Sequence, residues 1–378
     1  MERTAAETVF VLQGGGALGA YQAGACEALT AAADHPTWVA GISIGAINAA
    51  LIAGNPPERR IARLREFWEQ VTANLPAVPA VAAAPFSGLL REWISEWSGE
   101  LDAAIGVPGF FVPRLGAAAW RGAMPNPSYY DTAPLRETLL SLVDFDRLND
   151  GPVRLSVGAV DVQSGNFVYF DNRQQRIGPE HVMASGALPP GFPAVQIEGR
   201  WYWDGGIVSN TPLRHVVDNV AAPRATIFQV DLFSARGELP KTLSQVDARE
   251  KDIRFSSRTR AVTDTLRERH EMHRRIRALA AMLPASRRAQ PQVQAMLADT
   301  RDTAITLVHL IYRGNDSGAS AKDFEFSRAA MLGHWRAGHA DMAHSLRELA
   351  AAPRANGQGL FRVFDFDRHR HRSRKPRA

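Results

Sequence analysis

The sequence is poor in cysteine: Cys26 is the only one among 378 residues, which excludes an intrachain disulfide. This scarcity suits a reducing compartment. Because Cys26 falls in a stretch of helical character, we expect it to pack in the core rather than to react. A chain of this length buries a sizeable core without covalent cross-links. The sequence therefore indicates an ordinary globular protein.

Long hydrophobic runs are also lacking. The longest weakly polar stretch, Gly41–Gly54, is interrupted by Ser43 and Asn48 and is shorter than a membrane span requires. The apolar run Thr8–Leu12 is too short for the hydrophobic region of a secretory signal. We therefore expect a cytoplasmic protein, and peripheral contact with a membrane stays open.

Excess positive charge is confined to one segment. The chain has 44 Lys and Arg against 39 Asp and Glu, and six of the basic residues lie in Arg368–Arg377, which contains no acid. A basic tail without apolar residues is predicted to be disordered. Two roles stay open for it: aiding solubility, or attraction to anionic lipid headgroups. No nucleic acid is expected as a partner, because no aromatic residues alternate with the arginines.

Short buried strands alternate with helices in the first part of the chain. The strands Thr8–Gln13 and Trp38–Ile42 are each followed by a glycine-containing turn and a helix, over Ala20–Ala33 and Ala46–Ala53. This repeated order is typical of a parallel sheet with crossover helices. Further strands are predicted at Val153–Val160, Asn166–Phe170, Ile227–Leu232 and Thr306–Tyr312.

Three segments suggest how the chain is organised. Residues 76–128 are rich in Pro, Gly, Ala and Trp, and within them Leu90–Trp97 has the spacing of one apolar helical face. That face fits a helix packed on the core or a lipid-facing lid. Lys251–Leu283 is predicted to be one long basic helix, either solvated or lying on a membrane surface. Ser327–Ala352 is predicted to be another helix.

We expect one domain, because strands are predicted on both sides of the basic helix. A catalytic core would span residues 1–235, with a cap-like insertion at 76–128. A C-terminal extension at 236–365 would pack on the same domain, and the basic tail would occupy 366–378.

The segment Gly41–Gly45 fits the pattern G-x-S-x-G and lies between a predicted strand and a predicted helix. On such a sharp turn a serine is exposed and held in a strained backbone. The helix that begins after Ser43 adds its positive dipole end, which favours a developing oxyanion. The pattern alone is weak, because a tight turn can contain serine without any function.

The segment Gly14–Gly19 reads G-G-G-A-L-G and also follows a strand. Consecutive glycines let backbone N–H groups converge on negative charge. The loop can serve as an oxyanion hole or, because it formally satisfies G-x-G-x-x-G, as a dinucleotide site. Asp34 lies near the spacing of a ribose-binding acid, but it precedes the second strand instead of ending it. Ser43 ends that strand, which favours a hydrolase.

The segment Trp203–Gly206 is a tight turn that begins with a carboxylate. A serine nucleophile needs a base, which is usually histidine. None of the histidines, including His35, His181 and His215, lies in a loop with a catalytic signature. Asp204 as the direct base fits better, if partial burial raises its pKa toward neutrality.

These features, in this order, resemble the patatin-like phospholipases. In that family a glycine-rich oxyanion loop follows the first strand, G-x-S-x-G carries the nucleophile, and D-G-G or D-G-A carries the base. Ala184–Pro189 looks like the family's A-S-x-A-x-P loop, and Asn210–Leu213 looks like its N-x-P-x stretch. The resemblance covers about Val9–Leu232, and Lys322–Ser327 is similar to the C-terminal extension of a bacterial subgroup.

The resemblance implies a three-layer α/β/α fold with a central, mostly parallel sheet. It implies a serine acyl hydrolase that cleaves carboxylic ester bonds of lipids, as a phospholipase A, lysophospholipase or esterase does. Ser43 would be the nucleophile and Asp204 the base. The oxyanion hole would be formed by Gly14, Gly15 and Gly16.

No metal or cofactor is expected, because this chemistry needs none and no cluster of His and Cys is present. Many members of the family carry Arg or Lys in the glycine loop where this chain has Leu18, so the headgroup preference stays open. Two alternatives also stay open: a catalytically weak lipid-binding regulatory protein, and a transacylase or thioesterase that uses the same dyad.

Overall fold

The structure is a computed structural model that describes residues 6–72, 106–114, 126–256, 259–300, 303–313, 325–353 and 360–366. The expected apolar face Leu90–Trp97 and the basic tail lie outside these residues, as does most of the segment 76–128.

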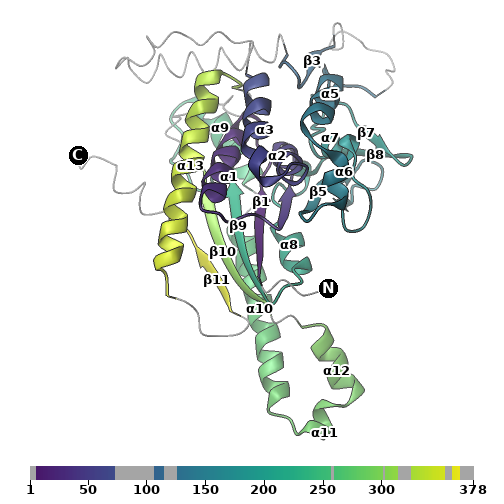
Figure 1. Cartoon of the computed structure of the whole chain (residues 1–378), viewed down its shortest axis with the longest axis vertical. Helices are drawn as coiled ribbons and strands as arrows, with labels where there is room; N and C mark the ends of the chain where they lie inside the picture. The colour runs from purple at the N-terminus through teal and green to yellow at the C-terminus, as the bar shows by residue number, and fades with distance from the viewer. Residues whose placement is uncertain are drawn as a thin grey trace, which may run out of the picture.

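One large sheet organises the fold (Figure 1). Within the described residues it has nine strands in the order β11-β10-β9-β1-β2-β5-β8-β7, and β6 pairs with β5. The strands from β11 to β5 are parallel, whereas β6 and β8 run antiparallel to β5, and β7 runs antiparallel to β8. The strands of this sheet are β1 Glu7–Leu12, β2 Trp38–Gly41, β5 Arg154–Asp161, β6 Phe167–Asp171, β7 Val195–Ile197, β8 Arg200–Asp204, β9 Arg224–Asp231, β10 Ala304–Ile311 and β11 Phe361–Phe364.

Helices cover both faces of the sheet, and a short ribbon of β3 (Val112–Pro113) and β4 (Tyr130–Asp131) lies apart from it. No helix in the described segments has the length and apolar character that a membrane crossing needs. The helices are α1 Ala20–Ala31, α2 Ile44–Ala53, α3 Pro57–Gln70, α5 Ala133–Leu142, α6 Phe145–Asp150, α7 Pro179–Ser185, α8 Leu213–Asn219, α9 Leu243–Phe255, α10 Thr259–Ala281, α11 Ala285–Arg288, α12 Pro291–Ala298 and α13 Arg328–Ala351, with 3₁₀ turns η1 Gly16–Gly19 and η4 Gly205–Ile207.

Alternate side chains of β1 enter two different cores, as the pleat of a strand requires. Phe10 and Leu12 join the core formed with α1, α2 and α13, whereas Val9 and Val11 join the core formed with α8 and α10. A strand buried on both faces reads as a continuous apolar run, which is what the sequence shows. The fold is therefore the expected α/β/α arrangement with a mostly parallel sheet. Cys26 is fully buried in α1 and unpaired, as expected.

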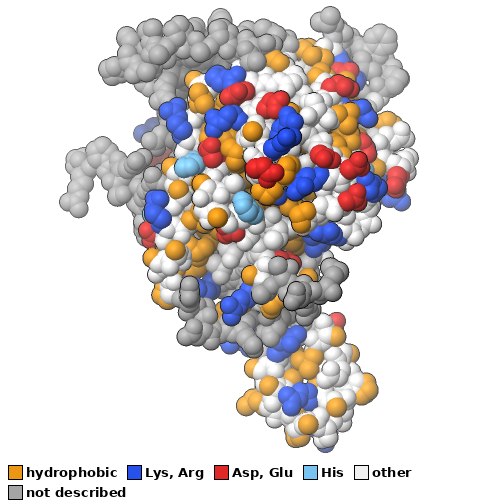
Figure 2. Space-filling view, viewed as in Figure 1, with side chains coloured by type: hydrophobic (Ala, Val, Ile, Leu, Met, Phe, Trp, Pro, Cys, Tyr) orange, Lys and Arg blue, Asp and Glu red, His pale blue; other side chains and the backbone are white. Residues whose placement is uncertain are grey.

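The segment predicted as one basic helix is two helices, so that prediction was wrong. α9 ends at Phe255 and α10 begins at Thr259. The hydroxyl of Ser256 donates to the carbonyl of Ile253 (3.0 Å), and such local bonds compete with continuation of a helix. The far end of α10 leads into the α11–α12 hairpin, which projects from the body of the molecule (Figures 1 and 2).

The C-terminal part of the chain continues the same sheet. β10 pairs in parallel with β9 along its whole length, and β11 pairs with β10. α13 lies alongside α1 (Figure 1). The helix starts where the sequence predicts, because the hydroxyl of Ser327 accepts a hydrogen bond from the N–H of Ala330 (3.2 Å).

Candidate active site

Ser43 occupies the sharp turn between β2 and α2. Its φ of 56° and ψ of −125° are unusual for a residue other than glycine and are typical of a strained nucleophile turn. The flanking glycines are required by close backbone contact. A Cβ at Gly41 would lie 2.2 Å from the carbonyl oxygen of Gly45, and a Cβ at Gly45 would lie 2.4 Å from that of Leu12. The G-x-S-x-G pattern therefore has a steric cause here.

A second serine holds this turn in place. The backbone N–H of Ser43 donates to the hydroxyl of Ser185 (3.0 Å), and that hydroxyl donates to the carbonyl of Gly158 in β5 (2.7 Å). Ser185 is fully buried at the end of α7. Because Ala159, the next residue of β5, pairs with Asp204 in β8, one hydroxyl links the nucleophile turn to the strand beside the proposed base. The sequence contained the signal in Ala184–Pro189, but no role for the serine was inferred from it.

Asp204 ends β8 and is 2% exposed. Its carboxylate accepts a hydrogen bond from the N–H of Gly206 (2.7 Å), and the side chain of Ser43 lies close enough to favour its charged form by hydrogen bonding. Burial raises the pKa of Asp204 to about 7, although both hydrogen bonds oppose the shift. The structure thus places Ser43 beside a carboxyl group that can exchange a proton near neutral pH.

The glycine loop lies against the same turn. A Cβ at Gly14 would lie 2.9 Å from the Cβ of Ser43. The N–H of Gly14 donates to the carbonyl of Asn210 (3.3 Å), and the side-chain amide of Asn210 donates back to the carbonyl of Gly14 (3.0 Å). Within the described residues, the N–H groups of Gly15 and Gly16 have no hydrogen-bond acceptor. Gly14 is therefore held by Asn210, and the two glycines after it keep donors available.

A buried polar network fixes the loop from the other side. The side-chain amide of Asn48, in α2, donates to the carbonyl of Gly19 (3.0 Å) and to the side chain of Gln22 (2.9 Å), and it accepts from the indole of Trp68 (3.1 Å). Leu18 is fully buried in the apolar core. A cation at this position would lie in that core, so the loop relies on its backbone donors.

The site opens into a small apolar cavity of about 80 Å³. Among the described residues, no histidine lines it. Its polar end is formed by the glycine loop, Ser43 and Asp204. Its walls are the side chains of Ile44, Ile47, Phe110, Phe111, Leu188, Phe192, Phe233, Phe255 and Phe326.

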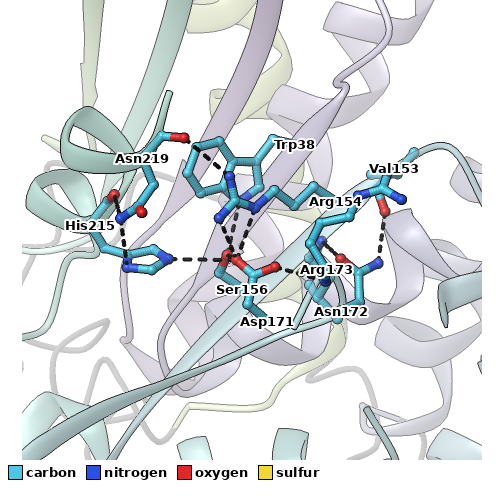
Figure 3. A network of polar contacts seen from close by, with 10 residues as sticks. Trp38, Val153, Arg154, Ser156, Asp171, Asn172, Arg173, His215 and Asn219 are labelled. Carbon is cyan, nitrogen blue, oxygen red and sulfur yellow. Dashed lines mark hydrogen bonds and ion pairs between the residues drawn. The ribbon is translucent and has the colours of Figure 1, made fainter. Parts of the chain in front are cut away.

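His215 belongs to a separate polar network (Figure 3). Its Nε2 lies 3.7 Å from the carboxylate of Asp171, and its ring stacks on that of Tyr169. Although burial opposes ionisation of Asp171, the nearby imidazole of His215 and hydrogen bonds from Arg154 and Ser156 hold its pKa well below the usual range. Ser156 donates to the aspartate and not to the histidine. This network is therefore not a Ser-His-Asp triad.

A larger cavity, of about 440 Å³, opens beside His215. Its only lining serine, among the described residues, is Ser209, whose hydroxyl points to the carbonyl of Thr211 (3.5 Å). Within the described residues, no serine or cysteine next to a base lines it, so the smaller cavity is the better candidate for the active site.

The acid required for dinucleotide binding lies away from the glycine loop. Asp34 accepts a hydrogen bond from the hydroxyl of Thr8 (2.9 Å), near the start of β1. The loop follows the other end of β1, about 15–20 Å along the strand. The two features therefore cannot act together on one ribose and its phosphates.

Two family models match the sequence. Residues 10–217 match the model described as patatin-like phospholipase, and residues 253–356 match one described as patatin phospholipase. No curated protein sequence gives a significant match.

Solved structures with a similar fold include VipD from Legionella pneumophila (13% identity, TM-score 0.39, 90% of this chain and 67% of that chain). They also include the type III effector ExoU, with 10% identity and a TM-score of 0.33, over 92% of this chain and 54% of that chain. Human GIVD cytosolic phospholipase A2 has 11% identity and a TM-score of 0.34, over 91% of this chain and 60% of that chain. The chain thus spans between about half and two thirds of these proteins.

Proposed function

The chain belongs to the patatin-like phospholipase family, and we propose that it is a serine acyl hydrolase that cleaves carboxylic ester bonds of lipids with Ser43 as nucleophile and Asp204 as base. One observation carries the proposal. Ser43 and the buried carboxylate of Asp204, whose pKa is raised to about 7, lie side by side at the polar end of one apolar cavity.

The reaction proceeds through a covalent acyl-enzyme. As the Oγ of Ser43 attacks the ester carbonyl carbon, its proton passes to Asp204. The tetrahedral intermediate collapses, and the leaving alcohol takes that proton. Water then attacks the acyl-enzyme and gives a proton to Asp204, which returns it to Ser43 as the fatty acid leaves. The carboxylate is thus restored at the end of each cycle.

The N–H groups of Gly15 and Gly16 are the proposed oxyanion donors. One such donor is worth about 3–4 kcal/mol of the barrier in comparable hydrolases. Gly14 contributes to the oxyanion hole indirectly, because Asn210 forms hydrogen bonds with both its N–H group and its carbonyl oxygen. The aromatic and aliphatic walls of the cavity favour the acyl chain over the headgroup.

Hydrolysis of a soluble p-nitrophenyl ester tests the proposal. We expect activity in the wild type and its loss in Ser43→Ala and Asp204→Asn. Ser345→Ala is a matched control, because Ser345 is fully buried in α13 and its hydroxyl has no partner within the described chain. A folded but inactive wild type, or activity retained in Ser43→Ala, would contradict the proposal. Release of free fatty acid rather than its transfer to an added alcohol separates hydrolysis from transacylation.

A further inference from the structure

α9 exposes an apolar face. The side chains of Leu243, Val246 and Ile253 are 84%, 48% and 56% exposed, and their spacing places them on one side of the helix. Leu239, just before the helix, is 88% exposed. Single exposed aliphatic residues are ordinary, whereas a contiguous group of them marks an interaction surface. We call these four residues the α9 face.

The helix that carries this face is firmly held. The hydroxyl of Thr242 accepts from the N–H of Gln245 (3.2 Å), and the side chain of Gln245 accepts from the N–H of Lys241 (2.8 Å). This reciprocal pair caps the start of α9. Arg249 donates to the carbonyl of Ser234 (3.0 Å), which joins the helix to the chain that follows β9. The exposed side chains therefore lie on an ordered element.

The helix that carries the α9 face ends at the proposed substrate cavity. Phe255, the last residue of α9, lines that cavity, and its ring packs on that of Phe233. The carbonyl of Phe255 accepts from the side chains of Gln13 and Asn210, which also contact the glycine loop or its neighbours. Because α9 has 13 residues, its face extends about 20 Å from the cavity wall.

We infer that the α9 face docks on the surface of phospholipid aggregates and so delivers lipid to the cavity beside Ser43. The inference rests on the proposed function, since it needs a lipid substrate. Four basic and three acidic side chains alternate along residues 241–255, so the helix has little net charge. This balance favours a zwitterionic lipid surface over a polyanion such as nucleic acid. Apolar side chains of a surface helix enter the boundary between headgroups and acyl chains.

Binding is measured by sedimentation with phosphatidylcholine vesicles, in the Ser43→Ala background so that no lipid is consumed. We expect the double substitution Leu243→Glu and Ile253→Glu to lower the partition coefficient of the protein onto vesicles about tenfold. The matched control is Leu279→Glu combined with Met282→Glu. These residues are 65% and 82% exposed near the α11–α12 hairpin, at the opposite end of the molecule from α9 (Figure 1). The control should bind vesicles as the parent does.

Activity separates this inference from the proposed function. In the enzyme with Ser43 intact, the α9 double variant should hydrolyse a soluble ester at the wild-type rate and vesicle phospholipid about tenfold more slowly. If the wild type lacks esterase activity, the proposed function fails, while the binding assay still reports on docking. Unchanged vesicle binding by the α9 variant overturns the inference. Loss of vesicle binding in the hairpin control alone also overturns it. The same holds if the α9 variant changes oligomeric state in sedimentation velocity while its vesicle binding stays intact.

Discussion

At the residue scale, the role proposed for Asp204 depends on the surroundings of its carboxyl group. A free aspartate is too weak a base to activate serine at neutral pH. Burial at the end of β8 raises its pKa to about 7, while the N–H of Gly206 and the side chain of Ser43 fix the direction of its carboxylate. The W-D-G-G sequence predicts the turn, but the pKa follows from burial, which the sequence shows only indirectly.

The raised pKa of Asp204 also makes a prediction about stability. The folded protein keeps the proton of Asp204 up to a pH of about 7, whereas the unfolded chain releases it near 3.8. The free energy of unfolding should therefore fall as the pH rises between these values. Asp204→Asn removes this pH dependence. The free energy of unfolding of the variant, relative to that of the wild type, should therefore increase by about 2–3 kcal/mol between pH 5 and 8. Urea unfolding of both proteins at pH 5 and pH 8 measures this change. The same difference in free energy of unfolding between variant and wild type at the two pH values would refute the prediction.

Ser185 is predicted to be a positioning residue for Ser43. Ser185→Ala removes the acceptor of the Ser43 N–H and leaves the strained turn less constrained. We expect kcat on a soluble ester to fall about tenfold to a hundredfold with KM little changed. The inflection of the pH–rate profile near 7 should remain, because Asp204 keeps its surroundings.

Ser345→Ala again serves as the control, since it removes an equally buried hydroxyl far along the chain. If kcat falls equally in both variants, or if KM rises while kcat holds, the role assigned to Ser185 is wrong.

At the element scale, the sequence predicts the strands whose side chains are apolar on both faces. β1, β2 and β10 lie within two residues of their predicted ranges, because burial on both faces produces uninterrupted apolar runs, whereas β9 begins three residues earlier than predicted, at Arg224. β7, β8 and β11 are harder to predict because they are short and partly exposed, and in β8 charged Arg200 and Asp204 flank three aromatic residues. The break between α9 and α10 is not predicted, because the apolar periodicity continues across it.

The contact between α1 and α13 depends on two glycines. A Cβ at Gly338 of α13 would lie 1.9 Å from the carbonyl oxygen of Tyr21, and a Cβ at Gly24 of α1 would lie 1.9 Å from that of Trp335. Neither clash can be relieved by a side-chain rotation. We therefore expect Gly338→Ala to lower the free energy of unfolding by about 3 kcal/mol.

Gly333, in the same helix, provides the comparison, because an added Cβ there meets nothing within 4 Å. Gly333→Ala should raise stability by up to about 1 kcal/mol through helix propensity. Thermal or urea unfolding of the two variants measures both effects. Equal effects of the two substitutions would show that the helix contact is not as close as described.

At the scale of the whole molecule, the C-terminal part of the chain completes the sheet instead of standing apart from it. β10 and β11 extend the parallel strands, and α13 covers α1. The division into a core at 1–235, an extension at 236–365 and a tail at 366–378 stays a prediction, as do the lid role of Leu90–Trp97 and the membrane role of the tail. The order of the three motifs was enough to predict the fold class. The anchoring by Ser185 and Asn210 needed the structure, because it joins segments far apart in the sequence.

The central claim is that Asp204 activates Ser43, and the pH dependence of covalent labelling tests it most directly. A fluorophosphonate should react with Ser43, as located by peptide mass spectrometry. Its rate should rise with pH, with a midpoint near 7, and then level off as Asp204 ionises. In Asp204→Asn, the rate should fall by about a hundredfold or more and lose that midpoint. Labelling of Ser43 at the same rate and with the same pH dependence in both proteins, or labelling at another residue, would contradict the account.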